Sequence, residues 1–245
     1  MRSVKRIFAI SMLAASVFAL ADCGFSPARY PDFSVETKTA PASSYKIFHQ
    51  KNPHIKFTLT RPLQENENTL LAVAGTYTSV ENTVLGFVVL DGSIIQSKER
   101  EAWDGAAIFQ NGSVEIIQTN NGALLAKEKL QEIAAQGSSL IQGHLLVSNG
   151  VAQHFKPQLL YRRRALAVMS DGASAIIESE TELDLNVFVA DLVSLGAQSA
   201  LNLDMGGFSE GWYRDPQTGV PIIIGEPSDS TSRQSNWIIL NDASR

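Results

Sequence analysis

The stretch Ser199-Ala200-Leu201-Asn202-Leu203-Asp204-Met205-Gly206-Gly207-Phe208-Ser209 contains an apolar, strand-like run that ends in one carboxylate, two glycines and a hydroxyl. It predicts a strand that ends in a bare turn, because glycine has no side chain to cover the backbone. Backbone N–H groups in such a turn can face an anion. We therefore expect a reaction site here with Asp204 as its acid, although an Asp that only hydrogen-bonds its own turn is the plainer interpretation.

The N-terminus predicts export. Arg2, Lys5 and Arg6 precede an apolar segment over Ile7–Ala21, which has the length of a signal-peptide core and is short for a membrane span. Small residues in Ala19-Leu20-Ala21 predict cleavage before Asp22, so residues 1–21 are expected to be a signal peptide and the mature chain to have no transmembrane segment. Periplasmic or secreted localisation follows. Lipid attachment at Cys23 is a less favoured alternative, because Asp22 is not the small residue that such a site needs, and a retained anchor is a third.

Charge and cysteine content exclude several functional classes. Without the three basic residues of the signal peptide, the chain has 17 basic and 25 acidic side chains. The resulting net charge of −8 would repel nucleic acid. Cys23 is the only cysteine, which excludes an internal disulfide and a thiolate metal cluster. Residues 22–44 are rich in Pro, Ser, Ala and Thr and predict an extended leader. Residues 45–245 are expected to form a single domain.

Short apolar or alternating runs predict mostly strands. Apolar and polar side chains alternate over Ile55–Leu63, the period of a half-buried strand. Asp91-Gly92 and Asn111-Gly112 are typical of hairpin turns. Further strands are expected at Tyr45–Gln50, Leu70–Ala74, Val84–Leu90, Ser93–Gln96, Ala106–Gln110, Ser113–Gln118, Leu140–Ser148, Ala165–Met169, Ser174–Glu178, Val220–Ile224 and Trp237–Leu240.

Two amphipathic helices are also expected. One carries Leu130 and Ile133 on its apolar stripe and ends near Gly137. The other begins after Thr181-x-x-Asp184 and ends at Gly196. Many strands with few helices predict an α+β fold, with a mixed, largely antiparallel sheet and a few packed helices.

The order of five motifs resembles the phosphodiester glycosidase family over roughly residues 65–215. They are Val73-Ala74-Gly75-Thr76-Tyr77, Gly86-Phe87-Val88-Val89-Leu90-Asp91-Gly92, Gly143-His144-Leu145-Leu146-Val147-Ser148-Asn149-Gly150, Arg164-Ala165-Leu166-Ala167-Val168 and the opening stretch. The resemblance implies an exported enzyme that hydrolyses a sugar-1-phosphate diester in an envelope or exopolysaccharide glycan. The expected partner is thus a glycan or sugar phosphate.

The resemblance also implies roles for individual residues. Asp204 would stabilise the positive charge that builds on the sugar ring, or attack the ring carbon. Arg164 would hold the phosphate, because its planar fork matches two phosphate oxygens, whereas Arg162 and Arg163 are interpreted as a solvated basic edge. The expected substrate-binding residues are Gly75, Tyr77, Gly143, His144, Gly206, Gly207 and Ser209. His144 would contact the phosphate or shuttle a proton, and Tyr77 would stack on the sugar.

The chain departs from the family pattern at several positions. Val73 stands where the family usually has Asn, Thr76 replaces an aromatic residue, and Met205 replaces Gly. The changes at Val73 and Met205 favour an alternative, a catalytically weakened relative that binds phosphate-bearing glycans. A structural envelope protein with no small ligand is a third hypothesis.

Other chemistry has weaker support. Most glycosidases use two carboxylates, and Glu210 and Asp171 are the candidates for a second acid, but a phosphate leaves readily without a proton. Gly207-Phe208-Ser209-Glu210-Gly211 fits the nucleophile motif of serine hydrolases, which needs a helix after the Ser and a later His; no His follows Ser209. No cofactor or metal site is predicted, and a divalent cation near Asp204 is left open.

Overall fold

The chain folds into three β-sheets and two α-helices in the computed structural model, which describes residues 28–98, 100 and 102–243. The expected signal peptide (1–21) and Cys23 lie outside the described residues. Among those residues, no helix is long and apolar enough to cross a membrane.

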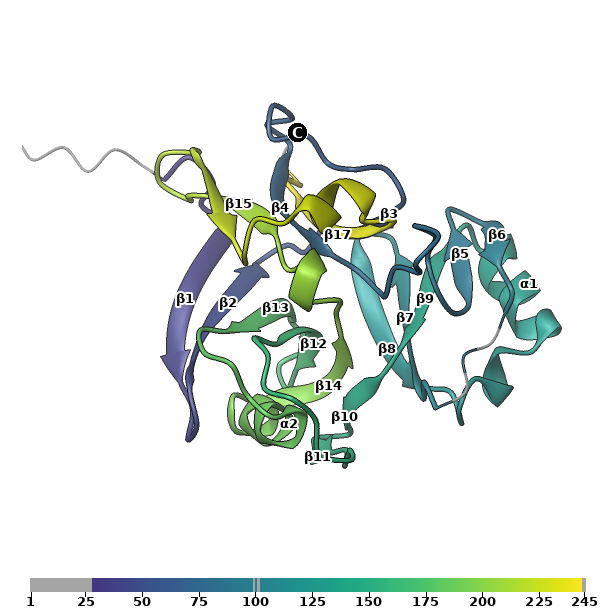
Figure 1. The fold of residues 1–245 in the computed structure, drawn as a ribbon. Coiled ribbons are helices and arrows are strands. Elements are labelled where there is room, and N and C mark those ends of the chain that lie inside the picture. Colours follow the sequence, from purple (N-terminus) through teal and green to yellow (C-terminus); the bar gives the residue numbers. More distant parts are fainter. Residues whose placement is uncertain (1–27, 99, 101, 244–245) are drawn as a thin grey trace, which may run out of the picture.

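The largest sheet has seven strands, and its strand β14 carries the first residues of the opening stretch of sequence (Figure 1). Its order is β1 (Phe33–Thr39), β2 (Ser44–Gln50), β13 (Ser174–Ser179), β12 (Arg164–Met169), β14 (Ala197–Asn202), β10 (Leu145–Ser148) and β11 (Val151–Ala152).

The two other sheets have five strands each. One has the order β16 (Pro221–Ile224), β15 (Gly211–Arg214), β4 (Thr69–Ala74), β17 (Trp237–Asn241) and β3 (Ile55–Thr58). The other has the order β6 (Ser93–Gln96), β5 (Val88–Leu90), β9 (Ser139–Gly143), β7 (Gly105–Gln110) and β8 (Ser113–Gln118).

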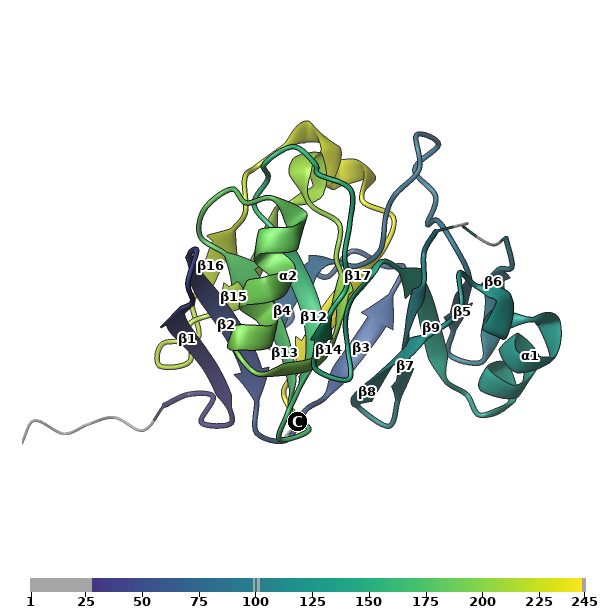
Figure 2. The ribbon, with the colours of Figure 1, turned by 90° about the horizontal axis from the view of Figure 1, so that it is seen from below.

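Both predicted helices form. Helix α2 (Leu185–Ser194) begins after Asp184, whose side chain accepts the backbone N–H of Asn186 as an N-cap. Its apolar face, with Phe188 and Leu192, is buried against the seven-stranded sheet (Figure 2). Helix α1 (Lys127–Ala135) lies beside β5 and β6 at the other end of the molecule.

The α+β prediction is confirmed only in part, because β-sheets dominate the fold and only two α-helices are present among the described residues. Every strand pairing among the described residues is antiparallel, so the expected mixed sheet is wrong in this respect. Short turns connect many of the neighbouring strands, and such turns favour antiparallel pairing.

One apolar core joins the three sheets. Phe48 of the seven-stranded sheet packs on Tyr213 of the β4 sheet with ring centroids 5.1 Å apart, and Ile141 of the third sheet belongs to the same cluster. All three sheets bury side chains in this core. Close packing there therefore holds the three sheets in fixed positions relative to one another.

Several segments differ from the prediction. The strand expected over Val84–Leu90 forms only over Val88–Leu90. Phe33–Thr39, inside the expected leader, forms β1 and pairs along its whole length with β2. The strand expected over Ile55–Leu63 ends at Thr58. The strand expected over Leu140–Ser148 divides at His144 into β9 and β10, which belong to different sheets. Periodicity could not predict this division, because both pieces are largely buried and show no alternation of buried and exposed residues.

Candidate active site

The end of β14 meets the end of β4. The backbone N–H of Asp204 donates to the carbonyl of Gly75 at 2.8 Å, and the N–H of Gly75 donates to the carbonyl of Asn236 at 3.3 Å. A Cβ atom at position 75 would lie 2.4 Å from Oδ1 of Asn236, so this contact requires glycine. Asp204 is therefore held by strands of two different sheets.

The Asp204 carboxylate is buried and hydrogen-bonded by backbone. Its Oδ2 accepts the N–H of Thr78 at 3.1 Å and its Oδ1 accepts the N–H of Met205 at 3.0 Å, while the residue is only 6% exposed. Burial raises the pKa of Asp204 to about 7, against the opposing effects of these two N–H groups and of the nearby Arg164 charge. Asp204 can thus exchange a proton near neutral pH.

A cleft of about 430 Å³ opens beside this carboxylate, and we call it the Asp204 cleft. It is lined by Tyr77, Gln158, Tyr161, Arg163, Asn202, Leu203, Asp204, Met205, Gly206 and Gly207. Asp204 is the only carboxylate among these lining residues, so the cleft offers one acid and one guanidinium.

Arg163 supplies that guanidinium. Its Nε donates to the carbonyl of Leu183 at 3.1 Å and its Nη2 to the carbonyl of Leu159 at 2.8 Å, and the group lies 5.3 Å from the ring centre of Tyr161. Burial lowers the pKa of Arg163, but an arginine stays charged at neutral pH. Since both anchoring carbonyls are neutral, the cation is positioned without being neutralised by them, and it can receive an anion in the cleft.

Arg164 lies beneath the site and does not line the cleft. Its side chain is fully buried, with Nε 2.8 Å and Nη2 2.5 Å from Oε2 of Glu178. Nη2 also donates to the carbonyl of Ser209 at 2.8 Å, while Nη1 has no hydrogen-bond partner in the described part of the chain. Arg162 reaches the other Glu178 oxygen at 3.0 Å. Arg164 is therefore placed to support the turn after Asp204 and to act on the acid through its charge.

Tyr77 forms one wall of the cleft and is backed by other rings. Its hydroxyl oxygen accepts a hydrogen bond from Nδ2 of Asn202 at 2.7 Å. Its ring centroid lies 4.8 Å from that of Trp103 and 5.8 Å from that of His144. Burial lowers the pKa of His144, which favours the neutral imidazole. His144 does not line the cleft; it packs behind Tyr77 and against Phe155 at 6.0 Å.

The glycines and Ser209 occupy different places. Gly206 and Gly207 line the cleft within a short 3₁₀ turn, Gly206–Phe208. Ser209 lies just beyond, where its Oγ accepts the N–H of Glu226 at 3.1 Å. Strand β15, and not a helix, follows Ser209, so the serine-hydrolase alternative is wrong. Gly143 is buried in β9, where a Cβ atom would lie 3.2 Å from Leu201.

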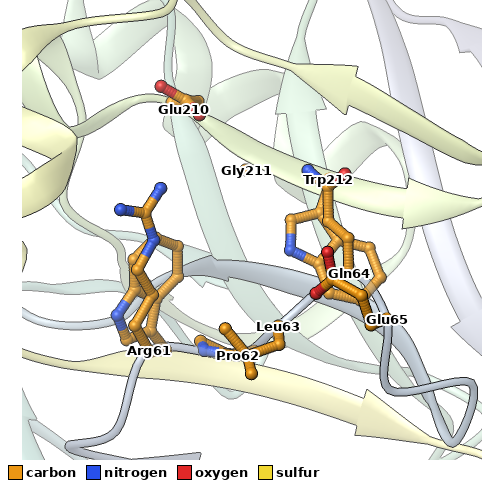
Figure 3. Close-up of a pocket in the computed structure, with 9 residues that line it drawn as sticks. Arg61, Pro62, Leu63, Gln64, Glu65, Glu210, Gly211 and Trp212 are labelled. Carbon is orange, nitrogen blue, oxygen red and sulfur yellow. The ribbon is translucent and has the colours of Figure 1, made fainter.

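The two candidate second acids are not part of the Asp204 cleft. Glu210 lines a separate cleft and accepts the hydroxyl of Thr231 at 2.9 Å (Figure 3). Asp171 lies in the turn between β12 and β13, at the opposite end of β12 from Arg164, and accepts the N–H of Ala173. Neither is among the residues that line the Asp204 cleft.

Two of the departures from the family pattern have different surroundings. Val73 is fully buried in the central core, so its side chain packs against other apolar residues and not into the cleft. Met205 does line the cleft. Among the described residues, no group of three His, Cys, Asp or Glu side chains is arranged to hold a metal ion.

The sequence patterns did not identify Gln158, Tyr161 and Asn202 as lining residues. The interpretation of Arg163 as part of a solvated basic edge was wrong, because this residue is buried and lines the cleft. Strand alternation places Arg163 on the opposite face from Arg162 and Arg164, but only the structure shows that the latter two face Glu178 and that Arg163 faces the cleft. Gln158 and Tyr161 lie in a connecting segment with no periodic signal.

Comparisons with known proteins identify a family and a similar fold. Residues 67–240 match the phosphodiester glycosidase family. No curated protein matches the chain. The zebrafish N-acetylglucosamine-1-phosphodiester alpha-N-acetylglucosaminidase catalytic domain, auto-inhibited by its pro-peptide, has a similar fold with a TM-score of 0.57 and 14% identity, over 85% of this chain and 81% of that chain. A hypothetical protein from Synechocystis matches with a TM-score of 0.50 and 14% identity, over 85% of this chain and 61% of that chain.

Proposed function

Because the chain belongs to the phosphodiester glycosidase family, we propose that it hydrolyses a sugar-1-phosphate diester in the Asp204 cleft. The observation that carries the proposal is the pairing of one titratable carboxyl, Asp204, with one anchored guanidinium, Arg163, in a single cleft. The fold similarity to the zebrafish enzyme suggests an N-acetylglucosamine 1-phosphodiester as the first substrate to test.

Arg163 holds the phosphate in this proposal. The guanidinium lines the cleft and is kept in place by two carbonyls, so it can donate to phosphate oxygens without losing an existing ion pair. The exposed backbone of Gly206 and Gly207 lies on the same cleft and lets the diester approach closely. Arg164, which sequence analysis assigned to the phosphate, instead supports Ser209 from below.

Asp204 acts on the sugar carbon. As the bond from that carbon to the phosphate oxygen breaks, positive charge develops on the ring, and the ionised carboxylate stabilises it or attacks the carbon. The bonding electrons leave with the phosphate oxygen, and water supplies the new hydroxyl of the sugar. The products are a free sugar and a phosphate monoester.

A single carboxylate suffices for this reaction. Glycosidases commonly protonate the leaving oxygen with a second acid, because an alkoxide leaves poorly. A phosphate monoester carries its negative charge on oxygens that Arg163 can stabilise, so the proton is not needed at that step. The absence of a second acid among the lining residues fits this leaving group.

We further propose that the protein acts outside the cytoplasm on an envelope or extracellular glycan. The basic, apolar N-terminus supports export as a periplasmic or secreted protein. Fusing residues 1–30 to a reporter that is active only after export tests this placement; a cytoplasmic reporter would contradict it.

Hydrolysis of a defined substrate tests the activity. Purified protein is given a methyl diester of N-acetylglucosamine 1-phosphate, and free sugar is measured over time. We expect release by the wild-type chain and a loss of about 100-fold or more in Asp204→Asn, which keeps the size of the side chain but removes its charge. Undiminished release by this variant would overturn the role of Asp204, and binding without release would favour a weakened relative.

A further inference from the structure

A second cleft lies between residues 61–65, the start of β15 and the start of β17. It has a volume of about 260 Å³ and is lined by Arg61, Pro62, Leu63, Gln64, Glu65, Glu210, Gly211, Trp212 and Trp237. We call it the tryptophan cleft. Figure 3 shows Arg61 on one side of it and Trp212 on the other.

Two indole rings form its floor on the outer face of the β4 sheet. Trp212 and Trp237 pack with Ala72 in a small cluster separate from the central core. Strand pairing places Trp212 between Ala72 and Ile223, and Ile223 is 46% exposed. The floor is therefore apolar and aromatic, and it continues onto an accessible surface.

One buried donor in this floor has no partner. Trp237 is only 3% exposed, and its Nε1–H makes no hydrogen bond to any described residue. An unsatisfied buried N–H destabilises the folded state, so such a group in a native protein needs an explanation. A ligand oxygen in the adjoining cleft would satisfy it once the Arg61 side chain that lies over the ring moves aside.

The rim adds fixed polar groups of both kinds. The guanidinium of Arg61 lies 6.0 Å from the ring centre of Trp237, a cation–π contact that orders a long side chain while leaving its N–H groups free to donate. Glu210 accepts the Thr231 hydroxyl through Oε2, which leaves Oε1 as an acceptor for a ligand. Donors and an acceptor thus surround an aromatic floor.

We infer that the tryptophan cleft binds a neutral pyranose unit of a glycan chain. Sugar hydroxyls both donate and accept, and one face of the ring presents C–H groups that pack on an indole. A free phosphate would face the carboxylates of Glu65 and Glu210, and an acyl chain would leave Arg61 and the Trp237 N–H unpaired. This inference goes beyond the proposed hydrolysis, since it concerns binding at a site that contains neither Asp204 nor Arg163.

The two clefts share one connecting segment. Gly206 and Gly207 line the Asp204 cleft, and Glu210 to Trp212 line the tryptophan cleft a few residues later. A glycan held in the second cleft is therefore kept close to the site of hydrolysis, which raises its effective concentration there.

Titration with a phosphate-free oligosaccharide tests the inference. The tetramer of N-acetylglucosamine is added to the full chain, and binding is measured by calorimetry. We expect Trp237→Phe, which removes the N–H, and Glu210→Gln, which removes the charged acceptor, each to weaken binding by about tenfold, the equivalent of about 1.4 kcal/mol. Asp204→Asn should bind as the wild type does, and Glu132→Gln on the exposed face of α1 is the matched control for Glu210→Gln.

Three results would overturn the inference. They are no binding of this tetramer or of a glucose tetramer at about 1 mM, binding that is lost in Asp204→Asn but kept in both cleft variants, and binding unchanged in both cleft variants. Because Glu210 is a partly exposed rim residue, its variant remains informative even if Trp237→Phe fails to fold.

Discussion

The backbone N–H of Asp204 donates to the carbonyl of Gly75 at 2.8 Å, and this bond joins the end of β14 in the seven-stranded sheet to the end of β4 in a five-stranded one. Thr78, just beyond Gly75, then donates its own N–H to the Asp204 carboxylate at 3.1 Å. The acid is therefore positioned by a neighbouring sheet as well as by its own turn. Its geometry depends on the close approach that Gly75 permits.

Gly75→Ala should disturb the site without touching Asp204. The added methyl would lie 2.4 Å from Oδ1 of Asn236, so the two segments must separate. We expect a loss of about 1–3 kcal/mol in the free energy of unfolding, measured in urea, and a fall in kcat. Combining it with Asn236→Ala, which makes room for the methyl, should cost less than the sum of the two single changes. Strict additivity would contradict this account of the contact.

The pH dependence of hydrolysis should follow Asp204. Burial raises its pKa to about 7, and the proposed chemistry uses the ionised form. We therefore expect kcat/KM to rise with pH through about 7 and then level off, in a series of buffers at constant ionic strength. A rate that falls as pH rises through this range would mean that the protonated carboxyl is the active form.

The same pKa predicts how stability changes with pH. The reference value for an Asp is 3.8, so between about pH 4 and 7 the native state keeps a proton that the unfolded chain has released. The stability that this proton contributes is lost as pH rises through about 7, by up to about 4 kcal/mol. Asp204→Asn has no carboxyl group to ionise, so its free energy of unfolding should not show this decrease. Urea unfolding should therefore show that the variant becomes more stable relative to the wild type as the pH rises from about 4 to about 8. A difference between the two that does not change with pH would contradict the raised pKa.

Substitution of Arg163 should mainly lower activity, whereas loss of the ion pair of Arg164 should mainly lower stability. Arg163→Gln should lower kcat/KM by about 100-fold or more, and Arg163→Lys should restore part of the loss, because a point charge replaces a fork. Glu178→Gln breaks the buried pair with Arg164 and should lower the free energy of unfolding by about 3–5 kcal/mol. Glu132→Gln, in an exposed pair with Lys129, should cost less than about 1 kcal/mol. A larger activity loss in Glu178→Gln than in Arg163→Gln would reverse the two assignments.

Sequence patterns predicted the local structure well where one period dominates. Hairpins at Asp91-Gly92 and Asn111-Gly112 and the capped helix after Asp184 have strong local signals, and all three form. The local signal for strand β1 is weak, because its segment lies among Pro, Ser and Thr. Pairing with β2 stabilises this strand, and local composition does not encode that contact.

Only some of the residues that line the cleft could be predicted, because the others are placed by contacts between distant segments. Asp204, Gly206, Gly207 and Tyr77 line one cleft, as the motif order implied. The choice between Arg163 and Arg164 depends on which face of β12 meets Glu178, and that is a property of the sheet and not of the three adjacent arginines. Gln158 and Tyr161 enter the cleft from a segment whose course is set by tertiary contacts.

In the proposed reaction the bond between the sugar carbon and the phosphate oxygen breaks, with Asp204 acting at carbon. Hydrolysis of the N-acetylglucosamine 1-phosphodiester in ¹⁸O-labelled water tests it directly by mass spectrometry of both products. We predict that the label enters the released sugar and is absent from the phosphate monoester. Label in the phosphate product would mean attack at phosphorus, and would contradict the role assigned to Asp204.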